Sequence, residues 1–191
     1  MKTILLIRHG MTKGNAEKRY IGLTDQPICD KGIEQAMVLS PTLPPCDTLF
    51  CSPLLRCRQT AELLFPSRNI KIIEDFREFD FGYFEGKTAD ELEGDLTYTE
   101  WLNSGCRDIV PGGEDVSIFK KRCCLAFCSI VAKLPECSTA AFVLHGGVIM
   151  AIMERFAEPK REFYDYHIEN CQCLCCTYEA GKLSLLEKSK C

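Results

Sequence analysis

Short apolar runs recur along this chain, each followed by polar or turn-forming residues. Such runs are too short for helices and are typical of buried β-strands. The pattern predicts strands at residues 3–7, 47–51, 70–73 and 140–144. Near the end of the chain, residues 173–178 and 183–186 lie on either side of Gly181 and predict a β-hairpin.

Between these runs, apolar positions recur at helical spacing and predict helices at residues 30–39, 116–134 and 148–157. A further helix is expected to start at Ser52, which suits the N-cap, with Pro53 at the first helical position. Pro66 should end it. Residues 74–113 are rich in glycine, acidic and aromatic residues and predict an irregular insertion with a short helix near residues 89–92.

Strands and helices thus alternate, which is typical of an α/β protein. We predict a three-layer fold with a mostly parallel central sheet flanked by helices. The 191 residues suit one domain with a sizeable core, and no repeat, low-complexity tract or linker divides them. The whole range 1–191 is therefore predicted as a single domain.

Charge and hydropathy narrow the class of partner. The net charge of −4 and the pI of about 5.5 argue against a broad basic surface for nucleic acid or an anionic membrane. The apolar run at residues 4–7 is too short for a signal peptide, and no run approaches a membrane span. We expect a cytoplasmic protein without nucleic-acid or membrane partners. Its oligomeric state, a homodimer included, stays open.

Cysteine is unusually frequent, with 14 residues that include a cluster at Cys171, Cys173, Cys175 and Cys176. Thiols of a cytosolic protein stay reduced, so a disulfide framework is not expected. Zinc sites usually need two paired ligand groups at defined spacing, and no such pairing occurs. We interpret the cysteines as small buried hydrophobic residues. The alternative is a cysteine-based metal or redox protein, which would contain bound zinc or iron.

Two predicted strands end in a histidine followed by glycine, at His9-Gly10 and His145-Gly146. In parallel sheets, ligands bind at the carboxyl ends of the strands, so both histidines are expected at one edge. The glycines would let a ligand approach the backbone. The third histidine, His167, is interpreted as structural or surface.

The sequence resembles the histidine phosphatase superfamily, which includes the cofactor-dependent phosphoglycerate mutases. The similar segments are residues 6–12 with Asn15, 22–27, 31–36, 52–61, 77–82 with Glu85 and Gly86, 111–114, and 145–149. They span nearly the whole chain in the family's order. The resemblance implies the phosphoglycerate mutase-like form of the three-layer fold. It also implies that residues 74–113 cover a substrate site.

The resemblance implies that His9 is the nucleophile, phosphorylated during turnover, and that Glu78 protonates the leaving group. The residues it implies for binding the substrate are Arg8, Asn15, Arg56, His145 and Gly146. Physical chemistry agrees, since neutral imidazole is accessible near pH 7 and the arginine fork matches phosphate. No metal or cofactor is implied, because arginines and histidines supply the positive charge.

Two of these assignments have competitors nearby. Arg56 would lie in the second turn of its helix, near the positive helix end, whereas Arg58 should face elsewhere. Glu78 lies in a carboxylate-rich stretch, and Asp80 is the reserve candidate for the acid. Thr12 either orders the histidine loop or simply caps it.

Three aromatic residues of the insertion, Tyr83, Phe84 and Trp101, could line a substrate pocket or pack the insertion onto the domain. Only residues 87–110 separate the Phe-Glu-Gly and Pro-Gly-Gly segments, a shorter cover than in the similar mutases. A shorter cover admits water.

The sequence therefore predicts a metal-independent phosphomonoesterase for a small phosphorylated metabolite. It looks most like the α-ribazole phosphatases of cobalamin biosynthesis, although Met11 stands where many members have glutamate. A phosphoglycerate mutase and a non-catalytic phosphate-binding protein are the alternatives. The identity of the phosphomonoester is left open.

Overall fold

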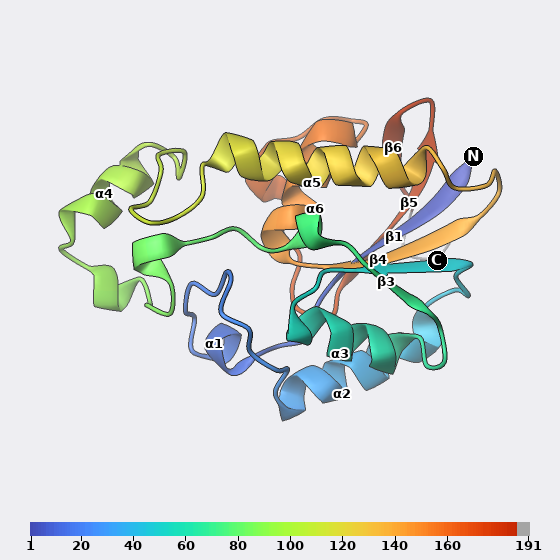
Figure 1. The fold of residues 1–191 in the computed structure, drawn as a ribbon, viewed down its shortest axis with the longest axis horizontal. Coiled ribbons are helices and arrows are strands. Elements are labelled where there is room, and N and C mark those ends of the chain that lie inside the picture. The colour runs from blue at the N-terminus through green and yellow to red at the C-terminus, as the bar shows by residue number, and fades with distance from the viewer. Residues whose placement is uncertain (187–191) are drawn as a thin grey trace.

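A computed structural model describes residues 1–186 and contains one six-stranded sheet (Figure 1). The strands follow the order β3 (Ile70–Ile72), β2 (Thr48–Cys51), β4 (Thr139–Leu144), β1 (Lys2–Arg8), β5 (Cys173–Glu179), β6 (Lys182–Leu185). The first four run parallel, and β5 is antiparallel to both of its neighbours. The predicted mostly parallel α/β sheet is confirmed. Residues 187–191, the end of the predicted domain, lie outside the described residues.

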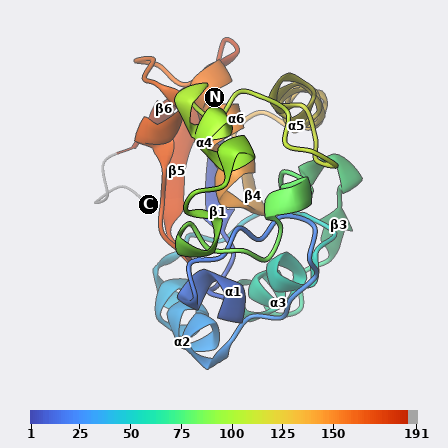
Figure 2. The same cartoon turned by 90° about the vertical axis from the view of Figure 1, so that its left-hand side faces the viewer.

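Helices cover both faces of the sheet. α5 (Val116–Val131) and α6 (Gly146–Phe156) lie on one side, and α2 (Asp30–Leu39) and α3 (Leu55–Leu64) lie on the other (Figures 1 and 2). Alternate residues of β1 point to opposite sides, so that its even-numbered apolar residues pack beneath α5 and α6 and its odd-numbered ones beneath α2 and α3. Because both faces are covered, the strand is apolar throughout its centre, from Ile4 to Ile7.

The helix after β2 begins later than predicted. Ser52 does not cap it, and α3 starts at Leu55, whose N–H donates to Oδ1 of Asp25 over 2.6 Å. A side chain distant in sequence thus satisfies the helix end, while the Ser52 hydroxyl is used elsewhere. As a result, Arg56 lies in the first turn of the helix and not in the second.

The insertion at residues 74–113 is less irregular than predicted. It contains α4 (Leu96–Asn103), which the sequence analysis missed although Asp95 is a good N-cap and accepts from the Tyr98 N–H. Single 3₁₀ turns form at Glu74–Phe76, Gly82–Phe84 and Asp90–Leu92, the last where a short helix was expected. The insertion has its own apolar cluster of Phe84, Leu92, Tyr98, Trp101 and Val110.

Other boundaries differ by a few residues. α5 ends at Val131 and not at residue 134, and α6 begins at Gly146, two residues early. The predicted hairpin is confirmed as β5 and β6, with positive φ at both Ala180 and Gly181. Shorter helical segments are α1 (Lys13–Ala16) and the 3₁₀ turns Ser40–Thr42 and Phe163–Tyr166.

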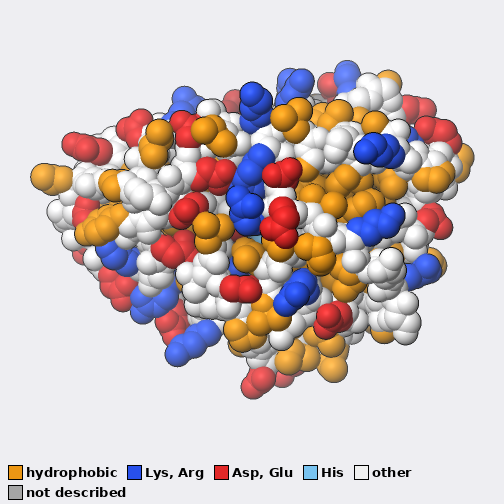
Figure 3. Space-filling model, in the orientation of Figure 1, with side chains coloured by type: hydrophobic (Ala, Val, Ile, Leu, Met, Phe, Trp, Pro, Cys, Tyr) orange, Lys and Arg blue, Asp and Glu red, His pale blue; other side chains and the backbone are white. Residues whose placement is uncertain are grey.

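Surface charge, cysteine burial and helix length relate to the predictions on nucleic acid, metal ions and membranes. On the face shown in Figure 3, basic side chains are interspersed with acidic ones. Cys171 and Cys175 are buried on the α2 side of the sheet and Cys176 on the α5 side, as expected of small hydrophobic residues, whereas Cys128 and Cys137 are exposed and do not fit that interpretation. Within residues 1–186, no three side chains of His, Cys, Asp or Glu are grouped as metal ligands would be. None of the described helices is long and apolar enough to cross a membrane.

Candidate active site

The sheet brings the two His-Gly segments together. β1 and β4 are neighbouring parallel strands in which Arg8 pairs with Leu144, so His9 and His145 follow the two strands side by side. Their rings lie edge to face with centroids 5.2 Å apart. The sequence predicted both histidines at one edge of the sheet, and their contact defines the centre of the candidate site.

His9 is almost completely buried. Its Nδ1 lies 2.8 Å from the carbonyl oxygen of Gly10. Because a carbonyl oxygen only accepts, Nδ1 carries the hydrogen and Nε2 keeps an unshared electron pair. Burial, followed by the positive charges of Arg56 and Arg8, lowers the pKa of His9 well below its ordinary value. The ring is therefore neutral near pH 7, the form that a nucleophile requires.

His145 is fully buried and stands at the N-cap position of α6. Nε of Arg56 donates to its Nδ1 over 3.2 Å. In the neutral ring, Nε2 then carries the hydrogen and donates to Oγ of Ser52 over 2.7 Å. Burial and the charge of Arg56 lower the pKa of His145 well below its ordinary value. Ser52, which was predicted to cap α3, instead positions His145.

Arg56 is held by backbone carbonyls. Its Nη1 donates to the oxygen of Thr24 over 2.9 Å, and its Nη2 donates to that of Gly22 over 2.7 Å. The Glu85 carboxylate fixes this loop by accepting from the N–H groups of both residues, at 2.8 Å from Gly22 and 3.0 Å from Thr24. Glu85 therefore holds Arg56 through the loop. Arg58 is exposed and faces away, as predicted.

Arg8 reaches the site from the end of β1. Its Nη1 donates to the carbonyl oxygen of Ile168 over 2.7 Å and lies 3.3 Å from Nε2 of His167. Its Nε is buried without a hydrogen-bond partner among the described residues. Burial lowers the pKa of Arg8, against the opposing charge of Glu78. His167 is exposed, as predicted, but its contact with Arg8 did not follow from the sequence.

Glu78 is buried beside the start of α6. Its Oε2 accepts from the N–H of Gly147 over 3.0 Å, and its Oε1 accepts from the N–H of Phe79 over 2.9 Å. Burial raises the pKa of Glu78, and the two backbone donors with Arg56 and Arg8 offset this only in part. The carboxyl group therefore keeps its proton to higher pH than an exposed glutamate.

The segment around Glu78 is anchored to α5. Arg122 pairs with Glu114 at 2.8 and 2.9 Å and donates to the carbonyl oxygen of Glu78 over 3.1 Å. Asp80, the reserve acid, instead accepts from the N–H of Gly82 over 2.9 Å and does not line the substrate-sized cavity described below.

Asn15 is oriented by two neighbours. It forms a capping box with Thr12 at α1, so Thr12 is a capping residue. Nδ2 of Asn170 donates to Oδ1 of Asn15 over 3.2 Å and to the carbonyl oxygen of His9 over 3.0 Å. These bonds occupy the oxygen of Asn15 and leave its amide N–H groups for a ligand. Asn170 was not predicted as a site residue, because nothing in the neighbouring sequence except its place before a strand marks it as one.

Four predicted site residues, Arg8, Asn15, Glu78 and Gly146, line a cavity of about 430 Å³. Most of the remaining wall is aromatic or aliphatic and includes Trp101. Of the other two aromatic candidates, Phe84 is buried inside the insertion, and Tyr83 is 48% exposed outside the cavity. Only Trp101 thus fits the pocket interpretation.

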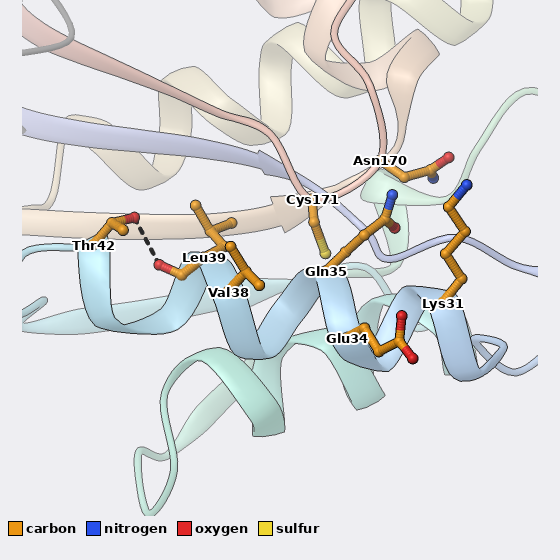
Figure 4. Close-up of a pocket in the computed structure, with 8 residues that line it drawn as sticks. All are labelled: Lys31, Glu34, Gln35, Val38, Leu39, Thr42, Asn170 and Cys171. Carbon is orange, nitrogen blue, oxygen red and sulfur yellow. Dashed lines mark hydrogen bonds between the residues drawn. The ribbon is translucent and has the colours of Figure 1, made fainter.

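A second pocket, of about 560 Å³, lies along α2 (Figure 4). It meets the site through two residues: Asn170, and Gln35, whose Oε1 accepts from the N–H of Met11 over 3.2 Å. Lys31, Glu34 and Val38 also line it. It has no histidine or arginine among its lining residues, and Lys31 is its one basic side chain.

Two known proteins are similar in sequence to most of this chain. The adenosylcobalamin/alpha-ribazole phosphatase of Salmonella typhimurium is 29% identical over 171 residues, covering 86% of this chain and 84% of that protein. The probable phosphoglycerate mutase GpmB of Salmonella typhi is 34% identical over 152 residues, covering 76% and 70%.

Solved structures are similar over almost the whole chain. A putative alpha-ribazole-5'-P phosphatase from Escherichia coli superposes with a TM-score of 0.87 at 25% identity, covering 97% of this chain and 94% of that one. A phosphoglycerate mutase from Thermus thermophilus superposes with a TM-score of 0.73 at 29% identity, covering 95% of both. The model of the histidine phosphatase superfamily (branch 1) matches residues 4–189, and this chain belongs to that family.

Proposed function

We propose that this chain hydrolyses a small phosphomonoester through a phosphohistidine on His9, without a metal ion. One observation carries the proposal: Nδ1 of His9 donates to the Gly10 carbonyl, which leaves Nε2 as an unprotonated nucleophile beside Arg8 and Arg56. Two guanidinium groups and the Asn15 amide can share the charge of the equatorial oxygens, which is most of what phosphoryl transfer requires.

In the first half-reaction, Nε2 of His9 attacks phosphorus and the bond to the leaving oxygen breaks. The Glu78 carboxyl group gives its proton to that oxygen, which leaves as an alcohol. The raised pKa of Glu78 supports this role, because the acid must hold a proton near the working pH. His145, neutral and with both ring nitrogens bonded to Ser52 and Arg56, packs against the ring of His9 and helps to hold the nucleophile in place.

In the second half-reaction, water attacks the phosphorus of the phosphohistidine. The Glu78 carboxylate accepts a proton from this water while the N–P bond breaks. Phosphate leaves, and Nε2 of His9 and the Glu78 proton are both restored. The sum is one phosphomonoester and one water converted to one alcohol and one phosphate.

We propose α-ribazole 5′-phosphate as the first substrate to test. Two similar proteins carry that name, and the apolar wall of the cavity suits a leaving group with a flat hydrophobic base. Phosphoglycerate mutase activity is the second candidate, favoured by the 34% identical relative. A mutase of this kind must hold a carboxylate, whereas Arg19, the second arginine of the cavity wall, is already paired with Glu17 and Glu91.

The test is hydrolysis of 4-nitrophenyl phosphate in excess chelator by wild type and His9→Ala, with acid-quenched and alkali-quenched samples assayed for phosphoenzyme. Wild type should turn over, and its label should be stable in alkali and labile in acid, as expected of an N–P bond. His9→Ala should lose both signals. Full activity in His9→Ala would overturn the proposal, as would a wild type that is inactive in chelator and restored by a metal ion.

Inactivity of both proteins on aryl and alkyl phosphates, with phosphate still bound, would favour a non-catalytic phosphate-binding protein. Transfer of phosphate between the hydroxyls of phosphoglycerate at a rate above its hydrolysis would favour the mutase.

A further inference from the structure

The cavity has two chemically different ends. Arg8, Asn15 and Glu78 form its polar end, beside His9. The opposite wall consists largely of aromatic side chains, among them Tyr20 and Trp101, whose rings pack edge to face with centroids 5.8 Å apart. A phosphoryl group bound at the polar end would therefore place its leaving group against rings.

Tyr164 stands out in this wall because it lines the cavity and is 59% exposed. It lies in the 3₁₀ turn Phe163–Tyr166, and its ring packs at 88° against that of Phe163. Its hydroxyl lies near the side chain of Cys106, which also lines the cavity. An exposed aromatic ring in the cavity wall is thus available for a flat ligand, and aromatic stacking contributes beyond the area that it buries.

The aromatic wall joins two distant parts of the chain. Cys106 follows α4 in the insertion, and its backbone N–H donates to the carbonyl oxygen of Trp101 over 2.9 Å. Tyr164 belongs to the segment after α6, which also carries His167 and Ile168, the partners of Arg8. Tyr164 therefore lies on the segment that contacts Arg8, whereas Trp101 lies on the insertion.

The charges on this wall disfavour leaving groups that carry a carboxylate or a second phosphate. Of the two arginines that line the cavity, Arg8 belongs to the polar end, and Arg19 is paired with Glu17 at 2.7 Å and Glu91 at 2.8 Å. A carboxylate or second phosphate on the leaving group would have to compete with Glu17 and Glu91 for Arg19, and would otherwise lie mostly among aromatic rings, which is unfavourable.

We infer that Tyr164, exposed in the same cavity wall as Trp101, determines leaving-group specificity by stacking on flat, uncharged groups. The inference rests on the proposed function, since it concerns the alcohol that this site would release. It assigns the choice of substrate to residues outside the phosphate-binding end.

The test compares kcat/KM for phenyl phosphate and for glycerol 3-phosphate in wild type and variants. Tyr164→Ala should lower kcat/KM for phenyl phosphate about tenfold, mainly through KM, and leave glycerol 3-phosphate within about twofold, because a lost aromatic contact is worth about 1–1.5 kcal/mol. Tyr164→Phe should keep most of the preference. Tyr83→Ala, which removes an exposed tyrosine outside the cavity, is the matched control and should change neither substrate.

Equal losses on both substrates in Tyr164→Ala would show a merely structural role and overturn the inference. So would an unchanged preference for phenyl phosphate.

A binding measurement separates this inference from the proposed reaction. Trp101 is the only tryptophan of the chain and lines the cavity, so its fluorescence reports on cavity occupancy. His9→Ala should bind phenyl phosphate more tightly than glycerol 3-phosphate, and adding Tyr164→Ala should remove the difference. If no variant hydrolyses either ester but this preference is present and lost with Tyr164, the proposed function fails while the recognition by Tyr164 stands. Equal binding of the two esters to His9→Ala would overturn the inference itself.

Discussion

The polar end of the cavity and its aromatic wall differ in the elements that carry them. Behind the polar end, the buried His9 and His145 follow adjacent core strands, and Arg56 lies in the first turn of a helix packed on the same sheet. The aromatic wall is assembled largely from loops, 3₁₀ turns and α4, with Trp101 and Tyr164 on segments far apart in the chain.

The two regions are also held by different forces. At the polar end, His145 accepts from Arg56 and donates to Ser52, Glu78 accepts from the N–H of Gly147, and His9 donates to the Gly10 carbonyl. The wall depends on ring packing and on bonds such as the one between the hydroxyls of Tyr20 and Tyr98, 2.8 Å apart. Reaction chemistry requires positions accurate to fractions of an ångström, whereas selection of a leaving group tolerates looser contacts. We therefore expect changes at the polar end to affect all substrates and changes in the wall to affect some.

The largest effect is expected from Glu78→Gln. Loss of the acid should lower kcat for an alkyl phosphate by roughly a thousandfold, the usual range for general acid catalysis. The loss should be much smaller for 4-nitrophenyl phosphate, whose leaving group needs no proton. In wild type, kcat/KM for alkyl esters should fall as pH rises through the raised pKa of Glu78, and this limb should vanish in the variant.

Asp80→Asn is the matched control, because that carboxylate contacts Gly82 away from the cavity. If Asp80→Asn and Glu78→Gln exchanged their expected behaviours, the acid would be reassigned to Asp80.

Arg56→Lys should lower kcat/KM by about a hundredfold or more on every substrate alike. A lysine keeps the charge but cannot bond His145 and two carbonyl oxygens at once, and lost transition-state donors cost about this much. Arg58→Lys, on the exposed face of the same helix, should be silent. A loss confined to one class of leaving group would break the division between the two ends.

Acid should destabilise the polar end first. The pKa values of His9 and His145 are lowered by burial, so protons bind the unfolded chain more strongly and stability falls as pH drops below about 6.5. Between pH 7.5 and 5.5, the free energy of unfolding in urea should fall by about 1 kcal/mol for each histidine. His145→Asn should halve this dependence, and an unchanged slope would contradict the buried neutral state of His145.

Glu78 works in the opposite sense. Its pKa is raised in the folded state, so its contribution favours folding at low pH and is lost as pH rises through the folded value. The Glu78→Gln variant should therefore lose more stability than wild type over the same acid range, which separates the two effects in the same urea titrations.

The smallest of these effects is expected from Glu85→Gln. The loop that holds Arg56 would lose a charged acceptor, and kcat/KM should fall about tenfold, equally for phenyl and alkyl phosphates. Glu93→Gln, at an exposed position in the same insertion, is the control. A change in leaving-group preference would mean that Glu85 acts on the wall and not through Arg56.

The sequence by itself determined the alternation of strands and helices and the placement of two histidines at strand ends on one edge of the sheet. Apolar periodicity and the His-Gly pairs are local signals. In a parallel sheet the carboxyl ends of the strands share one edge, so residues that follow the strands lie at that edge. The resemblance over nearly the whole chain pointed to the family that the comparisons established.

Only the tertiary structure decided which groups hold that chemistry in place. Asp25 accepts from the first N–H of α3, and Ser52 instead bonds His145. Asn170 donates to the carbonyl oxygen of His9, and Cys106 lies near Tyr164. Each of these contacts joins residues about 30 to 160 positions apart, as their numbers show. Such pairings leave no periodic trace in the sequence, because they depend on where the packed layers bring the loops together. The same holds for the protonation of His9, Glu78 and His145, which burial sets and sequence cannot reveal.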